Sequence, residues 1–433
     1  MKQNIFKSEE EELAIALEAI QKKLVGKTLT DREIYSIMDE IARNRLGEVL
    51  TTYFAASGYS KGFTNKELYY LTRAMVDTGD HLEFSGIVAD KHSIGGVPGT
   101  RTTLIVVPIV AAAGFTIPKS SSRAITTPDG TADDMEVLAP VVLSKDKIYK
   151  IVKKTNGCIV WGGSFGIAPA DDIIINIEKP LLFESYDKIL VSIMAKKVAF
   201  SSNHVVIDLP YGKMVKVHRV KDAEILKEKF EYLARKFKIR IKVLIHKTDE
   251  PAGRGIGPIL ETREALRVLQ QKPNRPLDLE QRSLNIATEL LKLCLKDSDK
   301  ELKEIVKENY GNCSNWAKKI LKDGEAFLKM QEIIKEQGGN PNIDSEDLKP
   351  GEISIRIKST KNGVVKRINS KNITMVGRLL GAPKQKGSGI YLNKKIGEKV
   401  AKNDTICTLY SESMYNLKNG KSAQTRFPII SVV

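Results

Sequence analysis

The stretch that decides the fold is DKHSIGGVPGTRTTLIVVPIVAAAGFTIP, residues 90–118. It opens with a turn rich in glycine and hydroxyl side chains, continues into the apolar run 104–113, and ends on the Ile-Pro pair 117–118. Short apolar runs between glycine turns are typical of buried strands. We therefore expect a strand at 104–107 and a helix at 108–114, at the start of an α/β region.

The chain beyond this stretch repeats the alternation of strands and helices. The segments that suit buried strands are 159–163, 205–208 and 241–245, and those that suit helices are 145–154 and 222–238. Strands that alternate with helices predict an α/β domain with a largely parallel or mixed sheet. Ser192 and Lys196 lie four residues apart in another helical pattern, so their side chains would share one face.

The two ends of the chain differ from this central region. The first ~80 residues contain three capping boxes, in which a Ser or Thr precedes a Glu by three residues, at Ser8/Glu11, Thr30/Glu33 and Thr64/Glu67. Glycines stand where helices should end, at Gly26, Gly47 and Gly79. The polar connector GGNPNIDSEDLKPGE, residues 338–352, precedes short alternating segments. These patterns predict a small helical domain at the start and a small β-rich domain at the end.

Length and composition bound the class of protein. A chain of 433 residues suits two or three domains. Its longest apolar stretch falls short of the ~20 residues of a membrane span, and its N-terminus lacks the pattern of a signal peptide. The four cysteines are far apart without a CxxC pair, which argues against a zinc site or a disulfide framework. We expect a cytoplasmic protein that does not bind a membrane.

The net charge of +16 calls for an anionic partner, and part of it is local. Residues 213–247 contain 12 basic and 4 acidic side chains. A solvated helix face, a phosphate-rich substrate and nucleic acid all fit this excess. Nucleic acid would require stacking aromatics in the patch. The only candidates are Phe230, Tyr232 and Phe237, whose spacing also suits a core, so we expect no nucleic-acid partner.

Two loops contain the parts of an anion site. In 90–103, Lys91 supplies a cation, Ser93 and Thr102 supply hydroxyls, and Gly95 and Gly96 let backbone N–H groups approach an anion. The second loop, SSSRAITTPDGTADDME at 120–136, repeats the theme. Neither contains a P-loop or a GxGxxG motif. The structural alternatives are an ordinary turn before a helix and a helix-capping loop.

The sequence resembles the thymidine phosphorylase family of nucleoside phosphorylases in both loops. SSRAIT at 122–127, APADD at 168–172, SIMAKK at 192–197 and GRGIGP at 253–258 resemble its AMP phosphorylases more closely. The resemblance implies an α/β fold with a small all-helical domain, a larger α/β domain with a mixed sheet, and a C-terminal β-rich α+β region. We place these domains at 1–79 (completed by about 165–200), at 80–164 with 201–337, and at 345–433.

The resemblance also implies an enzyme, a pentosyltransferase that converts AMP and phosphate to adenine and ribose 1,5-bisphosphate. CMP and UMP are alternative nucleotides, and no metal or cofactor is implied. A homodimer is expected. Larger assembly stays open, because the N-terminal domain typical of AMP phosphorylases has no counterpart ahead of the first helix. Hinges for closure are expected near 80–86 and 161–166.

Site residues follow by matching positions to the family's motifs. Those that resemble phosphate-site residues are Lys91, Ser93, Gly96, Thr102, Ser122 and Thr131. The nucleotide is expected to contact Arg123, Ala124, Ile125, Thr126 and Thr127 as well, and, on the side of the base, His92, Ser192, Lys196 and Lys216. His92 suits a hydrogen-bonded buried histidine equally well.

Two glutamates decide between members of the family. Pyrimidine-specific members resemble one another in an Arg seven residues after the Asp of APAD, but Glu178 stands there. A carboxylate cannot donate to a pyrimidine carbonyl, so pyrimidine-nucleoside phosphorylase is the weaker alternative. The expected proton donor to adenine is an Asp in AMP phosphorylases and Glu184 here. A phosphoribosyltransferase with a magnesium-binding pair at Asp133 and Asp134 is a further alternative.

Overall fold

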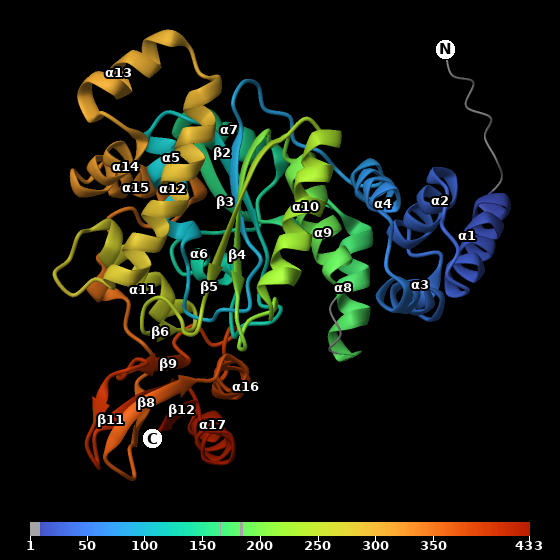
Figure 1. Cartoon of the computed structure of the whole chain (residues 1–433). Coiled ribbons are helices and arrows are strands. Elements are labelled where there is room, and N and C mark those ends of the chain that lie inside the picture. Colours follow the sequence, from blue (N-terminus) through green and yellow to red (C-terminus); the bar gives the residue numbers. More distant parts are fainter. Residues whose placement is uncertain (1–8, 165, 182–184) are drawn as a thin grey trace. The chain divides into compact units, whose positions relative to one another are not determined.

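The computed structural model describes residues 9–164, 166–181 and 185–433, with only the backbone given for residue 61 and residues 178–181 (Figure 1). The chain forms two compact units. The first comprises Met1–Ser85, Gly162–Asn203 and Ile225–Ile241, and the second comprises Gly86–Trp161, His204–Glu224 and Lys242–Val433. Within the described residues, no helix combines the length and apolar character needed to cross a membrane.

The first unit is built from helices. They are α1 (Glu9–Leu24), α2 (Asp31–Ala42), α3 (Gly47–Lys61), α4 (Asn65–Asp77), α8 (Pro169–Leu181), α9 (Tyr186–Ala199) and the later part of α10 (Val220–Lys236). Capping boxes begin α2 and α4 at Thr30 and Thr64, as predicted. The third box includes Ser8, which lies outside the described residues. The predicted stop at Gly47 is wrong, because this glycine is the first residue of α3.

Parallel strands form the centre of the second unit. A sheet of order β1-β4-β5 contains β1 (Ala89–Ser93), β4 (His204–Tyr211) and β5 (Arg240–Lys247), and β2 (Ile117–Ser121) pairs with β3 (Gly157–Trp161). The pairs β1–β4 and β2–β3 are both parallel. A parallel bridge between Val88 and Thr116, the residues just before β1 and β2, places these two strands side by side. The carboxyl ends of these strands therefore meet at one edge, where the two predicted anion loops begin.

Helices cover this sheet and bury a large apolar core. They are α5 (Thr103–Ala112), α6 (Thr131–Met135), α7 (Lys145–Thr155), α11 (Pro258–Leu269), α12 (Leu277–Asp297), α13 (Lys300–Tyr310), α14 (Cys313–Lys322) and α15 (Glu325–Gln337). Helix α5 packs against α12, α15 and β3 (Figure 1). The strand predicted at 104–107 is wrong, because these residues belong to α5. The helix is buried on every side, so its sequence shows no periodicity that separates it from a buried strand.

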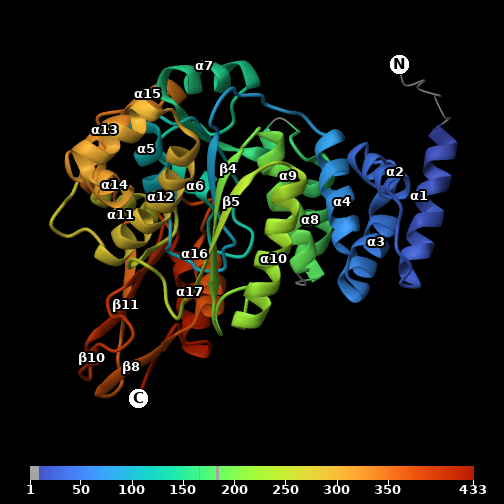
Figure 2. The ribbon, with the colours of Figure 1, turned by 45° about the horizontal axis from the view of Figure 1, so that its top comes forward.

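The end of the chain has an apolar core of its own within the second unit. One antiparallel sheet has the order β6-β9-β11-β7, with β6 (Gly255–Ile256), β9 (Gly389–Leu392), β11 (Thr405–Ser411) and β7 (Ile353–Lys358). A second has the order β10-β8-β12, with β10 (Lys399–Val400), β8 (Gly363–Ile368) and β12 (Ile430–Val432). Helices α16 (Ser370–Leu380) and α17 (Met414–Arg426) pack against each other beside these strands (Figure 2).

Candidate active site

The first anion loop is organised around a buried lysine on β1. The Nζ of Lys91 lies 2.9 Å from Ser93 Oγ and 2.6 Å from Thr102 Oγ1. Its side chain is 2% exposed. Burial lowers the pKa of Lys91 to about 8, although the charge of Asp208 opposes this shift. Three of the predicted phosphate ligands therefore converge, and the cation among them is poorly hydrated, which strengthens its attraction for an anion.

A carboxylate that was not predicted supports this group. Asp208 on β4 accepts a hydrogen bond from Ser93 at 2.8 Å, and it lies 2.7 Å from His246 Nε2 and 3.2 Å from Arg282 Nη2. Burial raises the pKa of Asp208, but the hydrogen bond from His246 and the charges of Arg282 and Lys91 outweigh it and keep the pKa well below its ordinary value. Asp208 is therefore ionised at neutral pH and holds Ser93 beside Lys91.

The structure separates His92 from these ligands and places Lys216 against Gly96. Side chains alternate along a strand, so His92, which is half-buried, lies on the opposite face of β1 from Lys91 and Ser93. Gly96 has a φ of +81°, and a Cβ there would lie 2.9 Å from Lys216 Cγ. The first loop therefore passes directly against Lys216, and a larger residue would not fit at position 96.

Carboxylates shape the second loop. Asp133 Oδ2 accepts hydrogen bonds from the N–H groups of Ala124 at 2.8 Å and Gly130 at 2.9 Å. Arg123 donates to Asp133 at 3.0 Å and to both carboxylate oxygens of Glu136, and it lies over the ring of Trp161. The hydrogen bonds from Arg123 lower the pKa of Glu136 to about 2. Arg123 thus fixes the loop, while its contact with nucleotide stays a prediction.

The same loop offers groups that the protein leaves unpaired. Within the described part of the chain, the backbone N–H groups of Ile125, Thr126 and Thr127 meet no acceptor. The hydroxyls of Ser120 and Ser121, at the end of β2, are buried and also lack a partner among the described residues. Buried polar groups normally form hydrogen bonds, so unpaired ones beside a loop indicate a place for a ligand. Two predicted phosphate-site residues, Ser122 and Thr131, lie on either side of the N–H groups of residues 125–127 in the sequence.

A buried ionic cluster joins the two loops. Arg101, which precedes Thr102, lies 2.9 Å from Asp129 Oδ1 and 2.8 Å from Glu261 Oε2, and it also contacts Asp134. Burial raises the pKa of both Asp134 and Glu261 well above the ordinary values. These three carboxylates are the described residues grouped closely enough to hold a metal ion, and Arg101 lies among them as the cation. Asp133 and Asp134, considered above as a magnesium pair, are therefore both engaged by arginines.

The first unit contains a separate polar group on α8 and α9. The Oδ2 of Asp171 lies 2.7 Å from both Ser192 Oγ and Lys196 Nζ. Burial raises the pKa of Asp171, but the charge and hydrogen bond of Lys196 outweigh this and lower it. The predicted pair Ser192 and Lys196 does share one face, at 3.3 Å. Asp171 belongs to the APADD motif, so the sequence held a signal for it.

The side chains of the two glutamates that distinguish family members lie outside the described part of the structure. Glu184, the predicted proton donor, lies outside the described residues, and of Glu178 only the backbone, within α8, is described. Their roles therefore stay predictions.

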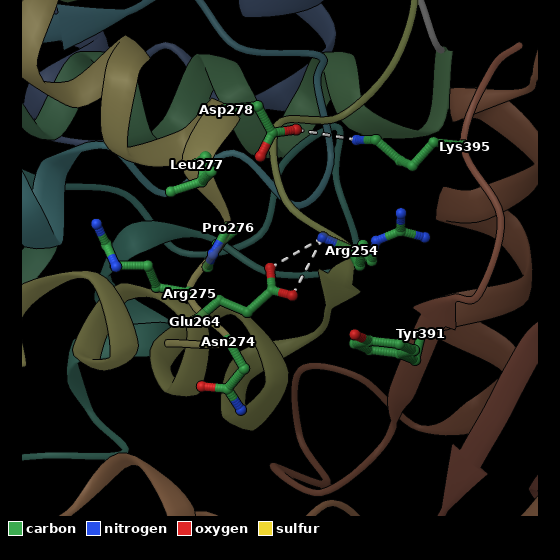
Figure 3. A pocket seen from close by; sticks show the side chains of 9 residues that line it. All are labelled: Arg254, Glu264, Asn274, Arg275, Pro276, Leu277, Asp278, Tyr391 and Lys395. Carbon is green, nitrogen blue, oxygen red and sulfur yellow. Dashed lines mark hydrogen bonds and ion pairs between the residues drawn. The ribbon is translucent and has the colours of Figure 1, made fainter. Parts of the chain in front are cut away.

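A second feature of the larger unit is a pocket of about 350 Å³ beside the C-terminal region (Figure 3). Its lining residues include Arg254, Glu264, Arg275, Tyr391 and Lys395. None of the predicted site residues that the structure describes lines it. Its cations are already paired with carboxylates: Arg254 with Glu398, Arg275 with Glu280, and Lys395 with Asp278. The loops around Lys91, and not this pocket, therefore have the properties of an anion site.

Family models match three parts of the chain. Residues 17–79 match the helical bundle domain of a glycosyl transferase family, and residues 85–327 match the α/β domain of the same family. Residues 364–425 match the C-terminal domain of pyrimidine nucleoside phosphorylases. These matches confirm the predicted fold class of a helical domain, a larger α/β domain and a C-terminal β-containing region.

Curated proteins resemble the chain over nearly its whole length. AMP phosphorylase of Thermofilum pendens is 42% identical over 93% of this chain and 76% of its own. AMP phosphorylase 1 of Archaeoglobus fulgidus is 41% identical over 96% of this chain and 80% of its own. AMP phosphorylase of Methanococcus maripaludis is 41% identical over 95% of this chain and 79% of its own.

A solved structure has a similar fold. The crystal structure of anthranilate phosphoribosyltransferase from Thermus thermophilus matches with a TM-score of 0.60 and covers 74% of this chain and 99% of its own. At 15% identity this likeness concerns the fold alone.

Proposed function

This chain belongs to the AMP phosphorylase branch of the glycosyl transferase family, and on that premise we propose that it converts AMP and inorganic phosphate to adenine and ribose 1,5-bisphosphate. The observation that carries the proposal is the convergence of Lys91 with Ser93 and Thr102 at the edge of the sheet. A buried ammonium with two hydroxyls suits a small anion, and the curated relatives that match nearly the whole chain are named AMP phosphorylase.

The reaction needs a nucleophile held beside ribose C1′. A phosphate oxygen supplies the electron pair of the new C1′–O bond, and the electron pair of the C1′–N bond leaves with adenine, which takes up a proton. Positive charge grows on the ribose as the bond to adenine breaks, and the bound phosphate stabilises it. We assign the binding of that phosphate to Lys91, Ser93 and Thr102, with Asp208 keeping the first two in place.

The other groups receive roles as part of the same proposal. Ser122 and Thr131 complete the phosphate site, and the 122–127 loop binds the nucleotide, with unpaired backbone N–H groups as donors. Ser192 and Lys196, held by Asp171, bind on the side of the base together with His92 and Lys216. Glu184 donates the proton to adenine.

A homodimer is also proposed, which light scattering in solution would test.

One assay separates this function from its alternative. The protein is incubated with phosphate and, separately, AMP, CMP, UMP, adenosine, uridine or thymidine, and the free base is measured. We expect adenine from AMP at a rate well above that from adenosine. The match of residues 364–425 to pyrimidine nucleoside phosphorylases is the reason to include the pyrimidine nucleosides. Release of base from thymidine but not from AMP would contradict the proposal.

A further inference from the structure

One face of helix α16 in the C-terminal region lies against the second loop. Arg378 Nη2 donates to the carbonyl oxygen of Ile125 at 2.6 Å, and Thr374 Oγ1 lies 3.2 Å from the carbonyl oxygen of Thr126. Positions 374, 377 and 378 are three and four residues apart and share a helical face. A helix that follows this loop by about 250 residues in the sequence therefore binds its backbone directly.

The approach of the helix to the loop is close. A Cβ at Gly377 would lie 2.8 Å from Pro128 Cγ, so the glycine lets the helix backbone approach the ring of Pro128 closely. A second contact comes from the segment after the helix, where Lys386 Nζ donates to the carbonyl of Asp133 at 3.1 Å and to Glu136 at 2.8 Å. The C-terminal region therefore holds both ends of the segment that runs from Ile125 to Glu136.

Residues on an adjacent face of α16 fix the helix in place. Ile373, Val376 and Leu380 are fully buried in the apolar core of the C-terminal region. Helix α16 also packs against α17 and β9. A shift of the helix toward or away from the loop would open this core, which is costly because protein interiors are close-packed. The loop is thus hydrogen-bonded to a rigid support.

Helix α16 donates to carbonyl groups of the loop and leaves the loop's N–H groups available to a ligand. Arg378 engages the carbonyl of Ile125, and the Thr126 carbonyl shares the Thr374 hydroxyl with the Ser370 carbonyl, whereas the N–H groups of Ile125 and Thr126 are unpaired within the described chain. No carboxylate is paired with Arg378 among the described residues, so the partners found for its guanidinium are backbone carbonyls.

We propose that Arg378 and Thr374 are positioning residues, through which α16 holds the 124–128 loop in the conformation that binds the nucleotide. This inference rests on the proposed function only in taking the loop's ligand to be AMP. The C-terminal region would then affect the affinity for the nucleotide, although it does not contact the phosphate that attacks the ribose.

The test measures the dissociation constant for AMP by calorimetry without phosphate, together with steady-state KM values. Arg378→Ala should raise the dissociation constant and KM for AMP about tenfold, the scale of one charge-assisted hydrogen bond. KM for phosphate should change less than about twofold, because the side-chain partners described for Lys91, Ser93 and Thr102 lie outside α16. Arg378→Lys should restore part of the affinity, since an ammonium can still donate to the Ile125 carbonyl.

Two further variants keep the test decisive. Lys371→Ala alters an exposed residue of the same helix and should match the wild type. Thr374→Val removes a hydroxyl that is shared between the carbonyls of Thr126 at 3.2 Å and Ser370 at 3.0 Å, so it should weaken AMP binding in the same direction as Arg378→Ala but by less. Unchanged AMP affinity in a folded Arg378→Ala protein, or an equal rise in KM for AMP and phosphate, would overturn the inference. A wild type that binds but does not cleave AMP would instead contradict the proposed function.

Discussion

The charge of Lys91 makes phosphate binding depend on pH. Burial lowers the pKa of Lys91 to about 8, so the ammonium is present below that pH and is lost above it. KM for phosphate should therefore rise as the pH increases through about 8. Arginine keeps its charge above pH 12. An active Lys91→Arg protein should accordingly show no rise up to pH 9.5, and a rise identical to that of the wild type would show that Lys91 is not the titrating group.

The proton donor can be tested even though Glu184 lies outside the described residues. Glu184→Gln keeps the size of the side chain but removes the proton, so release of adenine from AMP should slow about 10²-fold or more. The dissociation constant for AMP should stay within about twofold, because an amide retains most of the polar contacts. Glu228→Gln changes an exposed carboxylate of the same unit and is the matched control. An unchanged rate in Glu184→Gln would exclude the role.

Residue types and short motifs located part of the site from the sequence. Lys91, Ser93 and Thr102 lie within one loop motif, and hydrogen bonds do connect them. Asp208 ends an apolar strand pattern, which is a signal for a polar residue at a sheet edge. No role at the site was predicted for it. His246 and Arg282 reach Asp208 from β5 and α12, and no local pattern joins positions so far apart in the sequence.

The periodicity of apolar residues predicted amphipathic helices and short strands, but it did not distinguish a buried helix from a strand. The run 104–107 is apolar on all sides in α5, so strand and helix patterns coincide there. Helices α11 to α15 were not predicted individually, although α13 and α14 have clear capping residues at Asp299 and Asn312. The bonds between α16 and the second loop depend on tertiary packing alone.

Helix α15 ends in a residue that completes the edge of the α/β sheet. The side chain of Gln337 is fully buried, accepts from the N–H of Ile159 at 2.9 Å, and donates to the carbonyls of Ile159 at 3.0 Å and Pro140 at 2.9 Å. Gln337→Leu would leave these backbone groups buried without partners, so it should lower the free energy of unfolding by about 3 kcal/mol. Chemical denaturation measures this. Lys335→Ala, at an exposed site on the same helix, should change it by less than about 0.5 kcal/mol.

At the scale of the whole molecule, each compact unit is assembled from segments that are distant in the sequence. The boundaries at 85/86 and 161/162 coincide with the segments where hinges were predicted, although closure itself stays a prediction. The helical unit needs α8, α9 and part of α10 in addition to the first four helices. The match of the helical-bundle model to residues 17–79 therefore covers only the first of its segments.

This interlacing predicts how a fragment of the helical unit behaves. Residues 9–85 on their own lack α9, against which α4 packs, and α8, which packs on α2 and α3. They also lose Asp187, which accepts from the N–H of Phe63 at 3.0 Å, and the carbonyl of Ala199, which pairs with the N–H of Leu82 at 2.8 Å. Short helices without packing partners are marginal in water. We expect far-UV circular dichroism of this fragment to show partial helicity and a broad thermal transition.

A second fragment, in which residues 162–203 follow residues 9–85 through a flexible linker, is the matched comparison. It restores α8 and α9 and the bonds to Phe63 and Leu82, so its thermal transition should be cooperative and at a higher temperature. A sharp, cooperative transition already in residues 9–85 alone would show that the first four helices form an independent domain. In that case α8 and α9, with the Asp171, Ser192 and Lys196 group that they contain, would be attached to a preformed bundle and would not be part of its core.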